Sequence, residues 1–100
     1  MSRGVAVFLL FTATSCVGPA PHEDYTMAWT ALESARSSGA VKYAPGLWFK
    51  SDESFRLGQQ AYEDRYYDLA RRYFKNSRIY AEKAENSTRL KKFQSGDEVN

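Results

Sequence analysis

Residues 66–93 read YYDLARRYFKNSRIYAEKAENSTRLKKF, and this stretch decides the fold. Small residues recur along it at the spacing of one face of a helix. They are Ala70, Ser77, Ala81, Ala84 and Thr88, and aromatic residues flank them at Tyr66, Tyr67, Tyr73, Phe74 and Tyr80. The pattern predicts a helix of about 40 Å at 1.5 Å per residue. Its small face lets a neighbouring helix approach closely, while the rings close the sides of the contact.

A second helix is predicted over residues 45–63, directly before this long helix. Pro45 suits the first helical position because its fixed φ is already helical and its missing N–H has no helical partner there. Ser51 is an alternative start, since a serine N-cap there precedes Asp52 and Glu53 at the positive helix end. The residues expected to be buried are Leu47, Trp48, Phe55, Leu57, Gly58, Ala61 and Tyr62.

The junction between these two helices, Asp64-Arg65, contains neither glycine nor proline. Two alternatives follow from this. The helices fuse into one long rod, or a tight turn folds them back on each other. We favour the turn.

A first helix is predicted over residues 25–38, with Asp24 as its N-cap and Gly39 as its stop. One side of it carries Ala28, Leu32, Ala35 and Gly39, with Trp29 beside them. The three helices predict an all-α, three-helix domain over residues 24–93. A polar tail, residues 94–100, is expected to be disordered.

The N-terminal stretch VAVFLLFTATSC, residues 5–16, follows a positive charge at Arg3. Its apolar run is too short for a bilayer core, which needs about 20 residues, but it fits a secretory signal. The stretch resembles a bacterial lipoprotein signal peptide, with residues 1–15 removed and a diacylglycerol attached to the thiol of Cys16. This signal prefers leucine where the chain has Ala13. Ordinary signal peptidase cleavage, an uncleaved anchor and a chance apolar terminus are the alternatives.

The resemblance to a lipoprotein signal also implies a location. Val17, rather than aspartate, follows Cys16, which in lipoproteins of two-membrane bacteria implies the outer membrane. The protein is then expected to face the periplasm, held to the membrane through the lipid on Cys16. Residues 16–23 form the lipidated cysteine and a tether, because the VGPAPHE sequence is rich in proline and glycine.

Residues 55–82 resemble a single tetratricopeptide repeat. That repeat places Leu-Gly and small or aromatic residues at fixed positions of a helical hairpin. Leu57-Gly58, Ala61, Ala70, Phe74 and Ser77 occupy those positions here, whereas Ser54 and Glu82 replace its tryptophan and closing proline. One repeat cannot bury its own face. The first helix, another copy or a partner must therefore cover it.

Residues 25–84 resemble a broader family, the small bacterial lipoproteins known as domain of unknown function 4398. The likeness rests on these motifs, in order: the pattern A-x-x-A-L-x-x-A-R at Ala28–Arg36, Gly39-Ala40, Tyr43-Ala44-Pro45, Leu57, Ala61, Tyr67, Ala70, Ala81 and Ala84. Phe55 and Ser77 replace commoner alanines. Members are envelope proteins, some joined to an OmpA-like peptidoglycan-binding domain that this chain lacks. The resemblance implies location and fold, and no mechanism.

The sequence carries no catalytic constellation, metal-ligand cluster or cofactor motif. His22 is the only histidine, and in a tether a general base would lack rigid support. Residues 64–80 mix aromatic and basic side chains, as single-strand nucleic-acid binders do. The aromatic residues fall at core spacing, however, and the net charge is only +2. We therefore predict a protein that is no enzyme and binds no nucleic acid, metal or cofactor.

The leading functional hypothesis is an envelope lipoprotein whose helical module binds a protein partner or copies of itself. Its aromatic content, 15% of the chain, exceeds what a small helical domain comfortably buries. The residues expected at this contact surface are Trp48, Phe55, Tyr62, Tyr66, Tyr73 and Tyr80. The alternative is a structural envelope spacer, in which the last two helices fuse into a rod and oligomerise as an alanine-rich coiled coil.

Overall fold

The computed structural model describes residues 20–96, which form four helices and no strand. They are α2 (His22–Ser38), α3 (Ala40–Tyr43), α4 (Pro45–Glu63) and α5 (Tyr67–Ser95). The all-α prediction with a long last helix is confirmed, and α3 adds a single short turn that the sequence did not predict. The signal segment and Cys16 lie outside the described residues.

The helix ends agree with the prediction at Pro45 and Gly39 and differ elsewhere. Pro45 is the first residue of α4, and Gly39 ends α2 in the left-handed conformation at φ 101°. The prediction of Asp24 as N-cap is wrong, because α2 begins at His22, three residues before the predicted start, and Pro21 is at the N-cap position. Glu23 and Asp24 instead lie in the first turn, where carboxylates favour the positive end of the helix dipole. The end of the predicted tether belongs to α2, and the start of the predicted tail belongs to α5.

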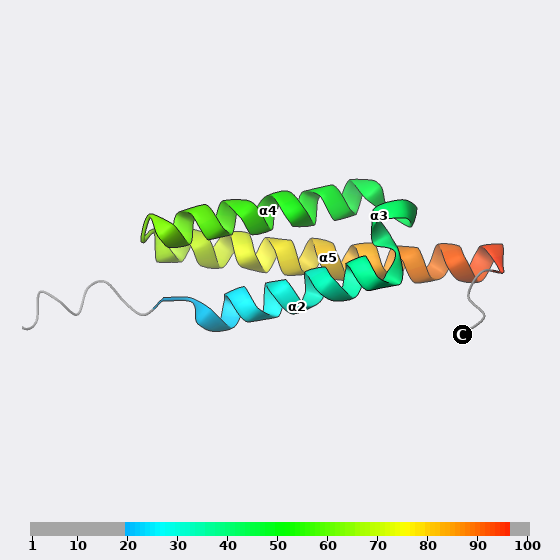
Figure 1. Ribbon diagram of the computed structural model, residues 1–100, viewed down its shortest axis with the longest axis horizontal. Helices are drawn as coiled ribbons and strands as arrows, with labels where there is room; N and C mark the ends of the chain where they lie inside the picture. The colour runs from blue at the N-terminus through cyan, green and yellow to red at the C-terminus, as the bar shows by residue number, and fades with distance from the viewer. Residues whose placement is uncertain (1–19, 97–100) are drawn as a thin grey trace, which may run out of the picture.

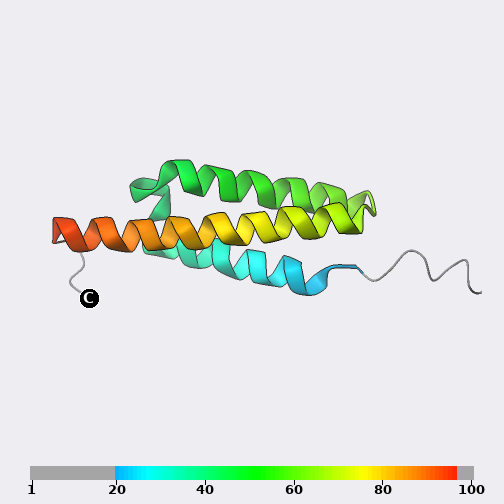
Figure 2. The same ribbon diagram turned by 180° about the vertical axis from the view of Figure 1, so that it is seen from behind.

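The helices lie side by side around α5 (Figures 1 and 2). α4 and α5 form an antiparallel hairpin, and α2 runs parallel to α5 along its other flank. α5 contacts both neighbours along its length, whereas α2 and α4 contact each other much less. The first helix is therefore what covers the hairpin, one of the three alternatives left open by the sequence.

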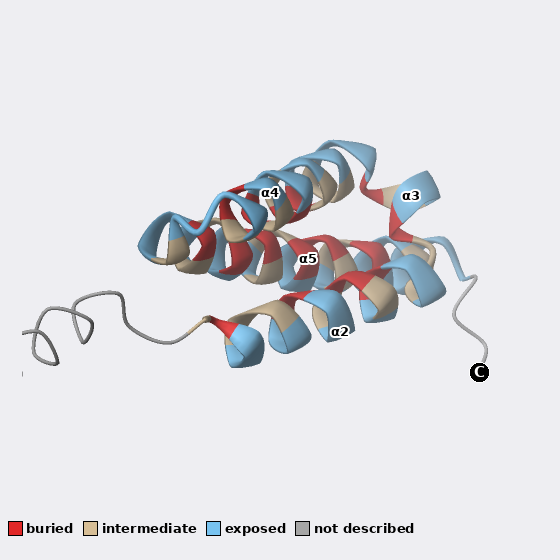
Figure 3. Ribbon diagram, turned by 60° about the vertical axis from the view of Figure 1, so that its left-hand side comes forward, coloured by how far each residue is buried: buried red, intermediate tan, exposed pale blue. Residues whose placement is uncertain are grey.

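The buried positions of α5 alternate at intervals of four and three residues. They are Ala70, Phe74, Ser77, Ala81, Ala84 and Thr88, all without exposed surface. Intervals of this kind place one seam of a helix against its neighbours, as in a coiled coil. Figure 3 shows the buried positions of the helices turned toward one another. The predicted small-residue face is confirmed, and Phe74, expected at its flank, belongs to it.

Two serines link α4 and α5 inside the bundle. The Ser51 hydroxyl donates to the Ser77 carbonyl, and the Ser77 hydroxyl donates to the Ser51 carbonyl, each over 2.9 Å. Both side chains are fully buried. Because both side chains are small, each hydroxyl reaches a backbone carbonyl of the opposite helix, and the paired bonds satisfy hydroxyl groups that would be costly to bury alone.

The core on one side of these serines is aromatic, and on the other side it consists of alanines. The aromatic core contains Ala28, Leu32, Phe55, Ala61, Ala70 and Phe74. The alanine core contains Ala35, Ala40, Ala44, Ala81 and Ala84. Leu57 was expected in the core and is 40% exposed, because its position on α4 faces away from the hairpin contact.

The end of α5 fastens the ends of two other helices. The Lys92 ammonium donates to the Ser38 carbonyl at the end of α2, and the Lys91 ammonium donates to the Tyr43 carbonyl at the end of α3. Cations are favourable at the negative C-terminal ends of helices. These lysines therefore cap the ends of neighbouring helices as well as lying at the negative end of their own.

A tight turn separates α4 from α5, as favoured from the sequence. Tyr66 N–H donates to the Ala61 carbonyl over 2.9 Å, and Arg65 N–H donates to the Tyr62 carbonyl over 3.1 Å. This pair of bonds is the Schellman ending of a helix, whose left-handed position is usually glycine. Here Arg65 occupies it, at φ 66°. The alternative in which these two helices fuse into one long rod is therefore wrong.

Replacing Arg65 by glycine is expected to raise the free energy of unfolding by about 0.5–1 kcal/mol. The left-handed conformation costs a residue with a Cβ about 1–2 kcal/mol, and glycine removes this cost. Part of the stabilisation is lost again because glycine gives the unfolded chain more conformational entropy. Urea unfolding followed by circular dichroism measures the change. Asp64→Gly is the matched control, because Asp64 already has an ordinary φ of −81°. It is expected to lower stability, and a lower stability for Arg65→Gly as well would contradict the prediction.

Candidate contact surface between α2 and α4

Aromatic side chains fill the space where α2 and α4 face each other above α5. The Tyr25 ring lies 5.4 Å from both Phe55 and Phe74, and the Trp29 ring lies 6.1 Å from Phe55, between ring centroids. These distances and tilted orientations are typical of favourable aromatic pairs. The rings thus replace direct contact between the two helix backbones. We name Tyr25, Trp29, Trp48, Phe55 and Tyr62 the aromatic seam.

The aromatic seam is closed on the side of α5 and open to solvent on the opposite side. Phe55 is 4% exposed, so it seals the bottom of the seam against α5. Trp29 keeps 45% of its surface exposed, and Tyr25, Trp48 and Tyr62 are half-buried. The Arg36 guanidinium lies over Trp48, 5.4 Å from the ring centroid, and adds a cation–π contact from α2 to α4. The seam therefore presents large rings and one cation to solvent.

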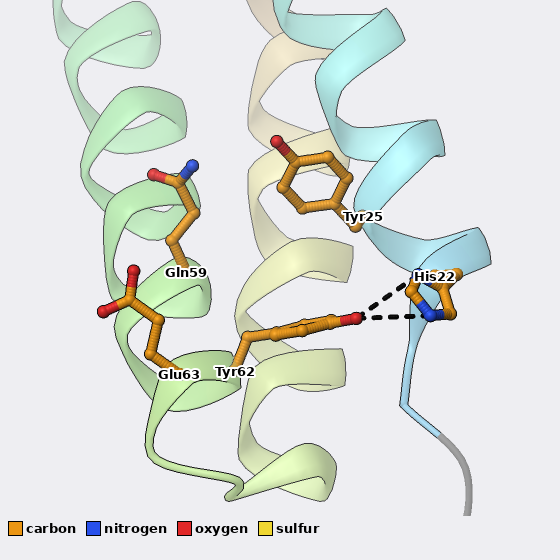
Figure 4. Close-up of a pocket in the computed structure, with 5 residues that line it drawn as sticks. All are labelled: His22, Tyr25, Gln59, Tyr62 and Glu63. Atoms are coloured by element: carbon orange, nitrogen blue, oxygen red, sulfur yellow. Dashed lines mark hydrogen bonds between the residues drawn. The ribbon is translucent and has the colours of Figure 1, made fainter.

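A pocket of about 280 Å³ lies at one end of the seam, where α2 begins and α4 ends (Figure 4). It is lined by His22, Tyr25, Gln59, Tyr62 and Glu63. Tyr62 reaches from α4 across to α2, and its hydroxyl lies 3.3 Å from His22 Nδ1 and 3.4 Å from Nε2. Ring faces beside an amide and a carboxylate can hold a small polar group or a partner's side chain by stacking and hydrogen bonding.

The predicted contact residues do not form one surface. Trp48, Phe55 and Tyr62 lie together in the seam, although Phe55 is a core residue and its prediction as a surface residue is wrong. Tyr80 is half-buried beside Lys50 of α4, whose ammonium lies 5.6 Å from its ring centroid. Tyr73 packs against the aromatic core. Tyr66 lies apart at the α4–α5 turn, 64% exposed, beside a second pocket.

Sequence reasoning missed the half of the seam that α2 contributes. Tyr25 and Trp29 were not among the predicted contact residues, and His22 was placed in a loose tether. A signal was present, since Trp29 is adjacent to the buried Ala28 and Tyr25 precedes it by one helical turn. That signal shows which face of α2 is apolar. It does not show that this face meets α4 across a row of rings.

Two further findings concern the described range, residues 20–96. No helix in it is long and apolar enough to cross a membrane. No group of three or more histidine, cysteine, aspartate or glutamate side chains in it is arranged to hold a metal ion.

The fold and the surface define a small helical module with partly exposed aromatic side chains between two of its helices. The model of the family called domain of unknown function 4398 matches residues 23–97, and the chain belongs to this family. The resemblance noted in the sequence is thereby confirmed over the helical part. No curated protein and no solved structure matches the chain.

Proposed function

We propose that this protein is a non-enzymatic bacterial envelope lipoprotein whose helical module binds a protein partner, or a second copy, through the aromatic seam. The observation that carries the proposal is the 45% exposure of Trp29 above a row of half-buried rings. Tryptophan, tyrosine and arginine supply most of the binding energy in protein interfaces. The seam offers all three, with Arg36 over Trp48.

The shape of the seam supports a protein partner. Phe55 closes its floor, so a side chain that enters between α2 and α4 meets ring faces on both sides without opening the core. The exposed rings are held by packing before any partner arrives, which lowers the entropy cost of binding. Polar groups at the pocket end, His22, Gln59 and Glu63, supply a rim that can orient the partner.

The location in this proposal rests on the sequence alone. Cys16 follows a secretory-type apolar segment and precedes the start of α2 at His22 by only a few residues. A lipid on Cys16 would hold the pocket end of the seam close to the bilayer. The module would then face the periplasm from the outer membrane, as the residue Val17 implies.

Photo-crosslinking from the seam tests the contact surface. A photoreactive residue replaces Trp29 in one variant of the full-length gene and Phe49 in another, in a two-membrane bacterial host. Phe49 is 57% exposed on α4 and is not part of the seam, so it is a control that is at least as accessible as Trp29. We expect a product of one defined mass from position 29 and none from position 49. Products from both positions, or from neither, would contradict the proposal.

The mass of the crosslinked product distinguishes a foreign partner from a second copy. Intact mass and fractionation beside Cys16→Ser test the anchor separately. We expect an acylated mature chain in outer-membrane fractions and a soluble product from Cys16→Ser. An unacylated wild-type chain would refute the lipoprotein and leave the contact surface standing.

The spacer hypothesis has lost its structural basis. It requires α4 and α5 to be one helix with an outward seam of small residues. The turn at Arg65 separates them, and Ala70, Ala81 and Ala84 are fully buried between helices of the same chain.

A further inference from the structure

A short corner joins α2 to α4 at one end of the bundle (Figure 1). It consists of residues 39–44, that is α3 with Gly39 before it and Ala44 after it, and we name it the α3 corner. Both flanking residues leave the helical conformation, Gly39 at φ 101° and Ala44 at φ −140°, ψ 59°. A helix of four residues is far too short to be stable by itself in water. The position of α3 therefore depends on what it packs against.

The buried side of the α3 corner packs against small side chains. Its buried residues, Ala40 and Ala44, belong to the alanine core. The larger side chains packed against that core, Leu47 and Trp48, are only partly buried. Hydrophobic stabilisation grows with the apolar area removed from water, and a methyl group removes much less area than a ring. The corner is therefore held less strongly than the aromatic core, which contains two phenylalanines and a leucine.

An unpaired hydroxyl group lies on α5 at the same end of the bundle. Thr88 follows Ala84 by one helical turn and precedes Lys92, which contacts Ser38, by another turn. Its side chain is fully buried. Within residues 20–96, Thr88 Oγ1 is the only buried side-chain nitrogen or oxygen without a hydrogen-bond partner. Burying such a group costs free energy, and this cost disappears when water reaches the hydroxyl. The closed arrangement thus carries a penalty that opening removes.

Two ammonium groups hold the α3 corner in place. Lys92 donates to the Ser38 carbonyl directly before the corner, and its Nζ lies 5.5 Å from the centroid of the Tyr43 ring. Lys91 donates to the Tyr43 carbonyl. Hydrogen bonds from charged donors are stronger than neutral ones and require no large apolar contact. We propose that the α3 corner is a strap that opens and closes while the aromatic core stays packed, with Lys91 and Lys92 as its latch.

Opening of the strap reaches the aromatic seam through Trp48. Trp48 packs against both the aromatic and the alanine core, and its backbone N–H donates to the Ala44 carbonyl over 2.9 Å. An open strap removes the alanine-core contacts and this hydrogen bond. The strap therefore determines whether Trp48 is fixed in the seam when a partner arrives. Only this consequence rests on the proposed function, because the opening itself requires no partner.

Amide hydrogen exchange of the full chain, followed by mass spectrometry, tests the opening. The hydrogen-bonded amides of the closed corner and of the helix that follows it include those of Lys42, Tyr43, Ala44 and Trp48. Their exchange reports opening, and it is compared with exchange in segment 52–61, which lies along the aromatic core. We expect segment 39–48 to exchange at least about tenfold faster after correction for intrinsic rates, because segments with few buried apolar contacts open more readily.

Lys92→Met tests the latch, with Lys83→Met as the matched control. Methionine keeps an unbranched apolar chain and removes the ammonium group, and Lys83 is an exposed lysine of the same helix. Lys92→Met is expected to speed exchange in segment 39–48 about tenfold, the scale of one hydrogen bond to a charged group, and to leave segment 52–61 unchanged. Lys83→Met should change neither segment.

Thr88→Val tests the buried hydroxyl. Valine has nearly the same shape as threonine and carries a methyl group in place of the unpaired hydroxyl. We expect exchange in segment 39–48 to slow about fivefold, from the cost of leaving such a group unsatisfied. Thr30→Val is the control, because Thr30 is exposed on α2, and it should leave exchange in this segment unchanged.

The fluorescence of Trp48 reports the consequence for the seam. Trp29→Phe leaves Trp48 as the only tryptophan of the chain. Acrylamide quenching of its fluorescence is expected to be stronger when Lys92→Met is added and unchanged when Lys83→Met is added. Equal quenching in all three proteins would refute the link between the strap and the seam.

Three exchange results would overturn the strap. Equal exchange of the two segments in the parent, or faster exchange of both segments in Lys92→Met, would show that the corner opens only when the whole module unfolds. An unchanged segment 39–48 in Lys92→Met would remove the latch. Faster exchange in Thr88→Val would contradict the penalty of the buried hydroxyl. The absence of a crosslink from position 29 would instead refute the proposed function and leave these exchange results unaffected.

Discussion

Phe74→Ala is expected to lower the free energy of unfolding by about 3–5 kcal/mol, the cost of deleting a buried phenylalanine. Phe74 has no exposed surface, and its ring lies 5.4 Å from Tyr25 of α2 and 5.6 Å from Phe55 of α4. One side chain thus joins all three long helices. A domain of this size has only a few kcal/mol of stability, so the variant should be largely unfolded at 37 °C.

Thermal and urea unfolding followed by circular dichroism measure this loss. Phe93→Ala is the control, because it makes the same chemical change on the same helix at a position that is 74% exposed. Its stability should remain within about 0.5 kcal/mol of the parent. Equal losses for the two variants would show that Phe74 is not the centre of the core.

Gly58→Ala is expected to destabilise the protein by about 1–3 kcal/mol, although alanine is the better helix former. A Cβ at position 58 would lie 2.6 Å and 2.7 Å from two carbon atoms of the Phe74 ring, well inside van der Waals contact. The ring cannot move aside, since Tyr25 and Phe55 pack against it. Glycine is thus present because the α5 ring fills the place of its side chain.

Gly46→Ala is the matched control for this substitution. Gly46 is also in α4, and nothing lies within 4 Å of a Cβ built there, so alanine should leave stability unchanged or raise it. A double-mutant cycle with Phe74→Leu isolates the clash. The cost of Gly58→Ala should shrink beside leucine. An undiminished cost would place the strain somewhere other than the Phe74 ring.

The periodicity of the sequence was sufficient to predict the long helices and the buried seam of small residues on α5. Ala70, Ser77, Ala81, Ala84 and Thr88 were predicted from spacing alone and are all fully buried. Pro45 and Gly39 set helix ends through their own backbone restrictions, which are local properties. Properties of this kind can be predicted because they depend on neighbours within one or two turns.

Pairings across helices could not be predicted in the same way. The ring of Phe74 was expected at the flank of the seam of small residues and not within it. It fits because Gly58 lies opposite, and that register depends on the length of the turn at Arg65. The aromatic seam was half missed for the same reason. Nothing in the spacing of α2 shows that Tyr25 and Trp29 meet Phe55.

The lysines at the end of α5 have a consequence for how the chain acquires its structure. Lys92 holds the carbonyl of Ser38, which precedes it by 54 residues, and the buried face of α2 packs chiefly on α5. Synthesis proceeds from the N-terminus, so α2 exists before the helix that covers it. The α4–α5 hairpin can form from adjacent segments, whereas the apolar face of α2 has no cover until α5 has been made. A nascent chain that stops short of Lys92 therefore lacks the ammonium group that caps the Ser38 carbonyl.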